Sequence, residues 1–243
     1  MKLVPVRKTS ASGAVFDQLI AELVAGRLEP GESLPAERAL TERLGVNRQA
    51  VREALQRLAQ AGLVKINQGE PTRALDYRRS AGLDLLPQLL FGAGGTLEVE
   101  VARSIIEMRA LIGPEAARLA ATRFRAEMLP ALESVVAEMG ATEDLGSLAR
   151  LDLDFWNLLI DGADNIAYRL AFNSLRETYE PMAASLSAVI AGELTDIDAH
   201  RTIVAAIGSS DGHAAEVAAR ALLARGSVAI TEALATLTSG DES

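Results

Sequence analysis

Residues 30–63 read PGESLPAERALTERLGVNRQAVREALQRLAQAGL, and this stretch decides the fold of the first third of the chain. Its pattern predicts a short helix over 36–44 that ends at Gly45, because glycine adopts the left-handed conformation that closes a helix. Asn47 is a good N-cap for the next helix, which we expect over 48–61. The stretch therefore encodes two helices separated by a tight turn.

The helix over 48–61 has one apolar and one polar face. Val51, Leu55 and Leu58 recur at helical spacing and predict the buried face. The residues expected on the other side are Arg48, Gln49, Arg52 and Gln56. Arg and Gln side chains read base edges in the major groove of DNA, and the free N–H groups of a helix N-terminus favour phosphate. The pattern predicts a DNA recognition helix.

The flanking sequence completes a small domain. Apolar residues at helical spacing predict a helix over 13–25. After Gly62, short strands are expected over 63–66 and 73–75, around a turn at 67–71. Three helices followed by a hairpin form a winged helix-turn-helix, which we assign to residues 1–79.

The charge of −9 is unevenly distributed along the chain. Residues 1–79 carry 13 Lys and Arg against 9 Asp and Glu, a net +4, whereas residues 80–243 carry 11 against 24, a net −13. A basic first third in an acidic chain suits a protein in which one domain binds nucleic acid and the other has a different task.

Residues 80–243 have few strand signals and many helical ones. The expected helices span 82–90, 97–124, 127–139, 145–161, 166–191, 195–208 and 212–237. Short loops between long helices predict an antiparallel bundle. The predicted fold class is therefore mainly α, with a small β-hairpin wing in the first domain.

Composition excludes several functions. The chain has no Cys, so it cannot form a thiolate site. Its only histidines are His200 and His213, so few residues are available for a Ser–His triad. No apolar run approaches the ~18 residues of a membrane helix, and the start of the chain does not read as a signal peptide. We therefore expect a cytoplasmic protein that does not contact membranes.

An enzyme built on the bundle is a distant alternative. It would use Asp152, Asp154 and Glu residues as a di-metal centre, which normally needs two Glu-x-x-His motifs. Ile197 and Ser210 stand three residues before the two histidines, so these motifs are absent. We expect no enzymatic activity.

The first domain resembles the GntR superfamily of bacterial transcription regulators. The resemblance rests on PGESLPAERAL at 30–40 and LGVNRQAVREALQRLAQAGL at 44–63. It implies operator contacts from Arg38, Asn47, Arg48, Gln49, Ala50 and Arg52, with Gln68 and Gly69 of the wing in the minor groove. The wing lacks the common Gly-x-Gly and is more similar to that of the FadR branch, where Lys stands in place of Glu70; Arg73 is expected to offset this acidic residue.

The second domain resembles the FCD effector domain that accompanies FadR-type winged domains. The similar segments are 107–121, 151–158 and 198–207. The family commonly holds a divalent metal with one Asp and three His. By position Asp152 and His200 match, whereas Trp156 and Leu222 stand where two histidines are expected. We therefore predict no bound metal and no cofactor.

Replacing metal ligands by Trp and Leu favours an apolar cavity suited to an acyl chain. The FadR branch likewise lacks the metal and binds long-chain acyl-CoA, so the expected effector is an acyl-CoA or a fatty acid. The residues expected to bind it are Arg109, Trp156, Tyr179, His200 and Leu222, with Arg225 and Ser227 at a nucleotide or thioester portion.

Other roles for these residues remain open. Trp156 is also compatible with core packing, the commoner role of a tryptophan on a helix, and the Tyr179 hydroxyl with a bond to a backbone carbonyl. Arg109 is compatible with an ion pair to Glu107 or Asp152, and His200 with a bridge between helices. An alternative effector is a small carboxylate held by a metal whose shell is completed by waters or Asp154.

Together these features predict a ligand-responsive transcription regulator of lipid metabolism genes. Two recognition helices must reach half-sites about one helical turn apart, ~34 Å, so we expect a homodimer on a palindromic operator. We expect a repressor, and the sequence leaves open whether the effector releases the DNA or secures it. The effector would shift the population of DNA-binding states through a linker at residues 76–84.

Overall fold

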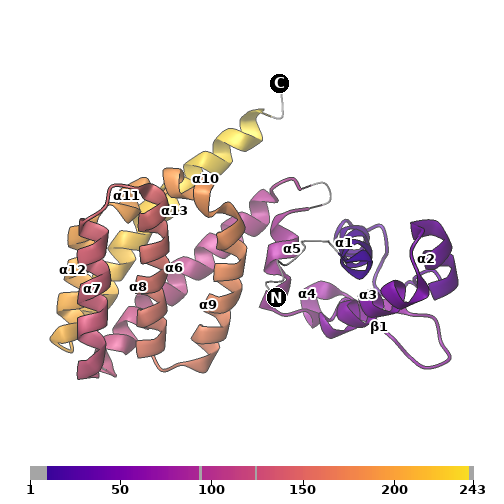
Figure 1. Cartoon of the computed structure of the whole chain (residues 1–243), viewed down its shortest axis with the longest axis horizontal. Helices are drawn as coiled ribbons and strands as arrows, with labels where there is room; N and C mark the ends of the chain where they lie inside the picture. The colour runs from indigo at the N-terminus through magenta and orange to yellow at the C-terminus, as the bar shows by residue number, and fades with distance from the viewer. Residues whose placement is uncertain (1–9, 93–94, 124, 241–243) are drawn as a thin grey trace, which may run out of the picture. The chain divides into compact units, whose positions relative to one another are not determined.

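The computed structural model describes residues 10–92, 95–123 and 125–240. The chain forms two compact units, Met1–Glu98 and Val99–Ser243, each with its own core (Figure 1). The end that the sequence predicts for one helix, at residue 124, lies outside the described residues.

The N-terminal unit is a winged helix-turn-helix, as predicted. Its elements are α1 (Ala11–Val24), α2 (Glu37–Leu44), α3 (Arg48–Gln60), β1 (Val64–Lys65) and β2 (Arg73–Ala74). The two strands are antiparallel, with Val64 opposite Ala74. Helix α3 packs on α1 through the predicted apolar face, where Val51 and Leu58 are fully buried.

The tight turn between α2 and α3 has the predicted caps. Gly45 ends α2 with a left-handed φ of 64°, which glycine adopts without the strain of a side chain. Asn47 Oδ1 accepts a hydrogen bond of 2.8 Å from the backbone N–H of Ala50 and so starts α3. These two residues set the direction of the recognition helix.

The segment after the wing packs on the N-terminal unit. It contains α4 (Tyr77–Ser80), the 3₁₀ helix η1 (Leu83–Leu85) and α5 (Leu86–Leu90). Leu85 is buried in the core of this unit, and Leu89 packs against that core. The compact units consequently divide after Glu98, later than the domain boundary that the sequence suggests at residue 79.

Close backbone contact fixes α4 to the end of α3. Ser80 Oγ lies 2.6 Å from the carbonyl oxygen of Gly62 and 2.8 Å from that of Asp76. Gly62 has a φ of 73°, and a Cβ at this position would lie 2.3 Å from the backbone oxygen of Ser80. Only glycine allows the two segments to approach so closely.

The C-terminal unit is the predicted helical bundle. Its α-helices are α6 (Val99–Thr122), α7 (Leu129–Gly140), α8 (Leu145–Gly162), α9 (Ile166–Tyr179), α10 (Ala183–Val189), α11 (Ala191–Leu194), α12 (Ile197–Gly208) and α13 (Gly212–Gly240), with 3₁₀ turns η2 (Ala126–Met128) and η3 (Glu180–Met182). Helix α6 packs along α13 and also contacts α8 and α12 (Figure 1). In the part of the chain that the structure describes, no helix is long and apolar enough to span a membrane.

The single helix predicted over 166–191 is wrong. The chain instead forms α9, η3, α10 and α11, with the break at Pro181. Proline lacks the N–H that a continuing helix needs and clashes with the preceding turn. The interruption matters because it places α11, a four-residue helix, against α8 and α13.

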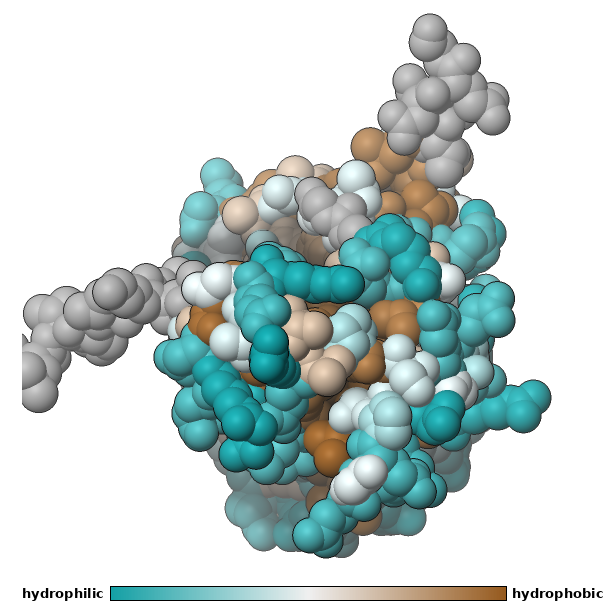
Figure 2. Space-filling model, turned by 90° about the vertical axis from the view of Figure 1, so that its right-hand side faces the viewer, coloured by the Kyte–Doolittle hydropathy of each residue, from teal (hydrophilic) through white to brown (hydrophobic). Residues whose placement is uncertain are grey.

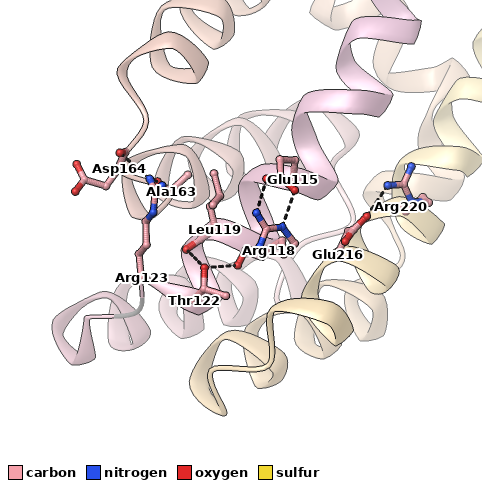
Figure 3. Close-up of polar contacts among 9 residues, drawn as sticks. All are labelled: Glu115, Arg118, Leu119, Thr122, Arg123, Ala163, Asp164, Glu216 and Arg220. Carbon is pink, nitrogen blue, oxygen red and sulfur yellow. Dashed lines mark hydrogen bonds and ion pairs between the residues drawn. The ribbon is translucent and has the colours of Figure 1, made fainter.

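Polar contacts occur within the C-terminal half of α6 and just after its end (Figure 3). Arg123 Nη1 donates to the backbone oxygen of Asp164, 2.9 Å away, just after the end of α8. Asp164 has a φ of 46°, so the arginine holds a left-handed turn in place. Nearby, Arg118 forms two hydrogen bonds with Glu115 along one face of α6 (Figure 3).

Candidate DNA interface and effector site

The N-terminal end of α3 presents a polar surface. Asn47, Arg48, Gln49 and Arg52 are exposed, as the sequence predicts. Ala50 is buried, so its side chain does not lie among them. Figure 2 views the side of the molecule that carries α2, where hydrophilic residues predominate and apolar ones lie between them.

One carboxylate holds two arginines of this surface. Glu37 Oε2, at the start of α2, accepts hydrogen bonds from Arg52 Nε at 2.9 Å and Arg48 Nε at 3.1 Å. Partial burial would raise the pKa of Glu37, but the hydrogen bonds and charges of Arg52 and Arg48 lower it overall. Arg38 is paired in the same way with Glu42, at 3.0 Å. Such exposed pairs contribute about 0–1 kcal/mol each, so DNA phosphates can replace them.

The wing tip is exposed, and both charged side chains near it form hydrogen bonds. Gln68 and Gly69 are exposed, and Gly69 has a φ of 80°. Glu70 Oε2 accepts a hydrogen bond of 2.8 Å from the side chain of Asn67. The Arg73 guanidinium donates to the backbone oxygen of Gly31 at 2.8 Å, and the side chain is exposed.

In the bundle, Asp152 joins two helices. Its Oδ1 accepts the indole N–H of Trp156 at 3.1 Å and lies 3.2 Å from His200 Nε2. His200 Nδ1 donates to the backbone oxygen of Asp196 at 2.8 Å. Burial lowers the pKa of His200, but the bonds to Asp152 and Asp196 outweigh it and raise the pKa overall. His200 therefore bridges α12 and α8, one of the roles that the sequence left open.

The donor set does not fit the metal that the FCD resemblance implies. Trp156 and Leu222 are both buried in the main apolar cluster of the bundle. Gly113 provides room for the indole, because a Cβ there would lie 3.3 Å from Trp156. Asp154 is exposed and cannot complete a shell around Asp152. Among the residues described, no three His, Asp or Glu side chains are placed to hold a metal ion.

Arg109 has a partner that the sequence did not suggest. Its guanidinium forms an ion pair with Glu193 on α11 and not with Glu107 or Asp152, the partners that the sequence left open as alternatives. The Glu193 side chain is completely buried and that of Arg109 is 25% exposed. Burial raises the pKa of the Glu193 carboxyl, although Arg109 acts in the opposite direction. Glu193 is the functional candidate that sequence reasoning missed, because its partner is 84 residues away.

Two buried polar atoms of this pair, and one of Tyr179, have no hydrogen-bond partner among the described residues. They are Arg109 Nη1, Glu193 Oε2 and the hydroxyl oxygen of Tyr179. The bond from Tyr179 to a backbone carbonyl, which the sequence left open as an alternative, is therefore not formed among the described residues. Burial and the charge of Asp152 raise the pKa of Tyr179 to about 12. Buried polar groups are normally paired, so these atoms mark a place where further hydrogen bonds can form.

The remaining candidates for effector contact separate in space. Leu222 is buried with Trp156, as expected for a lining residue. Arg225 is exposed and forms an ion pair with Asp196. Ser227 Oγ donates to the backbone oxygen of Leu223 at 2.8 Å. The structure thus brings Arg109, Tyr179 and Trp156 into one electrostatic cluster around Asp152, but not Arg225 or Ser227.

Comparison with known proteins identifies both units. Residues 11–73 match the gntR family of bacterial regulatory proteins, and residues 104–225 match the FCD domain. The chain is 43% identical to the HTH-type transcriptional regulator Mce2R of Mycobacterium tuberculosis over 223 residues, which are 92% of each protein. It is 39% identical to the fatty acid metabolism regulator protein of Vibrio cholerae over 102 residues, 42% of this chain and 35% of that one. These relatives are named as regulators, in agreement with the expectation of no enzymatic activity.

Solved structures agree with the fold. A GntR family regulator from Pseudomonas syringae is 24% identical with a TM-score of 0.51, over 98% of this chain and 91% of that one. The Lar protein of Listeria monocytogenes is 16% identical with a TM-score of 0.56, over 94% and 98%. The chain therefore belongs to the GntR family of DNA-binding transcription regulators and carries an FCD domain after its winged helix-turn-helix.

Proposed function

We propose that this regulator binds a palindromic operator as a homodimer in the cytoplasm and contacts bases and phosphates with the N-terminal end of α3. The proposal rests on the exposed polar surface of that helix end. Arg48 and Arg52, which Glu37 orients, contact DNA, Arg38 contacts the adjacent backbone, and Gln68 and Gly69 of the wing enter the minor groove.

The effector that we propose is a long-chain fatty acid or acyl-CoA, and the regulated genes belong to lipid metabolism. The observation that carries this proposal is the burial of Trp156 and Leu222 in one apolar cluster, at positions where the FCD resemblance implies metal-binding histidines. An apolar interior with a few polar groups suits an acyl chain better than a metal-bound small carboxylate. The matching segment of a Vibrio protein named for fatty acid metabolism supports the same class.

The operator half of the proposal is tested with DNA selected from a random pool. Arg52→Ala should weaken operator binding by about tenfold or more and lower the salt slope by about one. Arg103→Ala on α6, where the arginine is equally exposed and paired with Glu100, is the matched control and should change neither. Equal operator affinity of Arg52→Ala and wild type would remove α3 from the interface.

The effector half is tested by native mass spectrometry of the protein as purified, followed by operator binding with and without a long-chain acyl-CoA or fatty acid. A co-purified acyl compound that changes operator affinity is the expected result. Stoichiometric zinc or nickel in place of an acyl compound would contradict the proposal.

A further inference from the structure

The buried ion pair between Arg109 and Glu193 joins two helices that are distant in sequence. Arg109 lies on α6 and Glu193 on the four-residue helix α11. The other charged or titratable groups that interact with Glu193 are Asp152 on α8 and His200 on α12, and Tyr179 on α9 is also close enough to be affected by it. Taking both charges out of water costs several kcal/mol per ion, which the pair recovers only with good geometry and further hydrogen bonds.

Those further bonds are missing. Glu193 Oε2 and Arg109 Nη1 have no partner among the described residues, although the Glu193 side chain is fully buried. The space beside Glu193 depends on Gly226 of α13, where a Cβ would lie 1.9 Å from Glu193 Oε2. A guanidinium offers five N–H donors, so Arg109 is only partly satisfied by the carboxylate it holds.

We propose that Glu193 is an internal carboxylate that occupies the effector's anchoring point on Arg109, and that the effector is accordingly a compound with a free carboxylate, which replaces Glu193 on the guanidinium. An arriving carboxylate repeats the charge and the hydrogen bonds of Glu193, so the exchange leaves the charge at Arg109 unchanged. Because α11 has only four residues, turning Glu193 away from Arg109 disturbs a single helical turn.

This inference deepens the proposed function, on which it rests, and chooses between its two effectors. The head of a fatty acid is a carboxylate, which matches a guanidinium in charge and in planar geometry. A thioester is uncharged and gains nothing comparable from a buried arginine. The site therefore favours the free acid over its coenzyme A thioester.

Trp156 provides the measurement. It is the only tryptophan of the chain, and its indole N–H bonds to Asp152. The full-length protein is titrated with decanoate, decan-1-ol and decanoyl-CoA while tryptophan emission is followed. Decanoate should bind at least tenfold more tightly than decan-1-ol, which has the same chain without the charge.

Glu193→Gln tests the competition directly. The variant keeps the shape of the side chain but removes its charge, so decanoate affinity should rise by about tenfold if Arg109 is free in about a tenth of wild-type molecules. Glu115→Gln is the matched control, because Glu115 is also a carboxylate paired with an arginine on α6, yet lies at the surface. Its decanoate affinity should equal that of the wild type.

Two further measurements keep the test decisive if Glu193→Gln is unstable. Decanoate should then raise the melting temperature of this variant more than that of the wild type. The double variant Arg109→Gln with Glu193→Gln replaces the ion pair by two neutral amides and should bind decanoate no better than decan-1-ol.

The proposal is overturned if Glu193→Gln binds decanoate no more tightly than the wild type and gains no extra thermal stability from it. It is also overturned if decan-1-ol binds as well as decanoate. If decanoyl-CoA binds tightly in either case, the acyl-effector function stands without the internal carboxylate. If none of the three compounds binds, the internal-carboxylate proposal fails, and the native mass spectrometry described above decides the long-chain acyl effector separately.

Discussion

Arg52 Nε lies 2.9 Å from Oε2 of Glu37, so the recognition helix and helix α2 share a carboxylate at the proposed DNA surface. The same oxygen accepts Arg48, and this single acidic group orients two arginines. A carboxylate between them fixes their spacing but also repels phosphate. Removal of this carboxylate should therefore raise the affinity for DNA in general and lower the preference for the operator.

Glu37→Gln should bind non-specific duplex DNA several-fold more tightly, because one negative charge leaves the surface. The ratio of operator to non-specific affinity should fall, because Arg48 and Arg52 lose their common hydrogen-bond acceptor. Fluorescence anisotropy at one fixed salt concentration measures both affinities. Glu42→Gln, which frees only Arg38, should raise non-specific affinity without lowering the ratio. A ratio unchanged in Glu37→Gln would show that the carboxylate does not position the arginines.

Gly62→Ala should destabilise the N-terminal unit much more than the same substitution at another left-handed glycine. The left-handed conformation alone costs about 1–2 kcal/mol, and the new Cβ would lie 2.3 Å from the backbone oxygen of Ser80. Gly26→Ala is the control, since Gly26 has a φ of 69° but nothing within 4 Å of a Cβ. Thermal unfolding should show a clearly larger loss for Gly62→Ala; equal losses would mean that the contact with Ser80 is not tight in solution.

Trp156→His combined with Leu222→His should create a metal site. These substitutions restore the two histidines that the FCD resemblance implies, beside Asp152 and His200, which already lie 3.2 Å apart. Zinc should bind the double variant and raise its melting temperature, since one Asp and three His supply enough ligands. The matched variant with Gln at both positions should gain no zinc-dependent stability. Failure of the histidine variant to bind zinc would show that Leu222 is not directed at Asp152.

Stability should depend on pH through Glu193. Burial raises the pKa of this carboxyl above its ordinary value of 4.5, so the folded state holds the proton to higher pH than the unfolded state. The contribution of Glu193 to stability is therefore fully present below pH 4.5 and declines as pH rises toward its folded-state pKa. Urea unfolding of wild type and Glu193→Gln between pH 4 and 8 measures it. The free energy of unfolding of the wild type relative to the variant should fall across that interval; a rise would contradict the assignment.

The local parts of the fold were accessible from the sequence. Gly45 adopts the left-handed conformation that ends a helix, and the Asn47 side chain caps the next one. The structure places both residues as expected. The break at Pro181 was missed although the proline marks it, because strong helical periodicity continues on both sides. The helical periodicity therefore predicted one continuous helix, although Pro181 lacks the N–H that such a helix needs.

The effector site was accessible only in part. Trp156, His200 and Asp152 lie one turn apart or match a family segment, and the structure brings them together. Glu193 could not be found, since nothing in its neighbourhood indicates that α11 turns it toward Arg109. Ion pairs between distant helices depend on the packing of the whole bundle, which periodicity does not describe.

The attachment of α4 has a mechanical consequence. Ser80 is bonded to the end of the recognition helix through Gly62, and Leu85 is inserted into the same apolar core. The linker at 76–84 is thus held to the end of α3 by a hydrogen bond and by apolar packing. We therefore expect that a displacement imposed on Leu85 also moves α3, which carries Arg48 and Arg52.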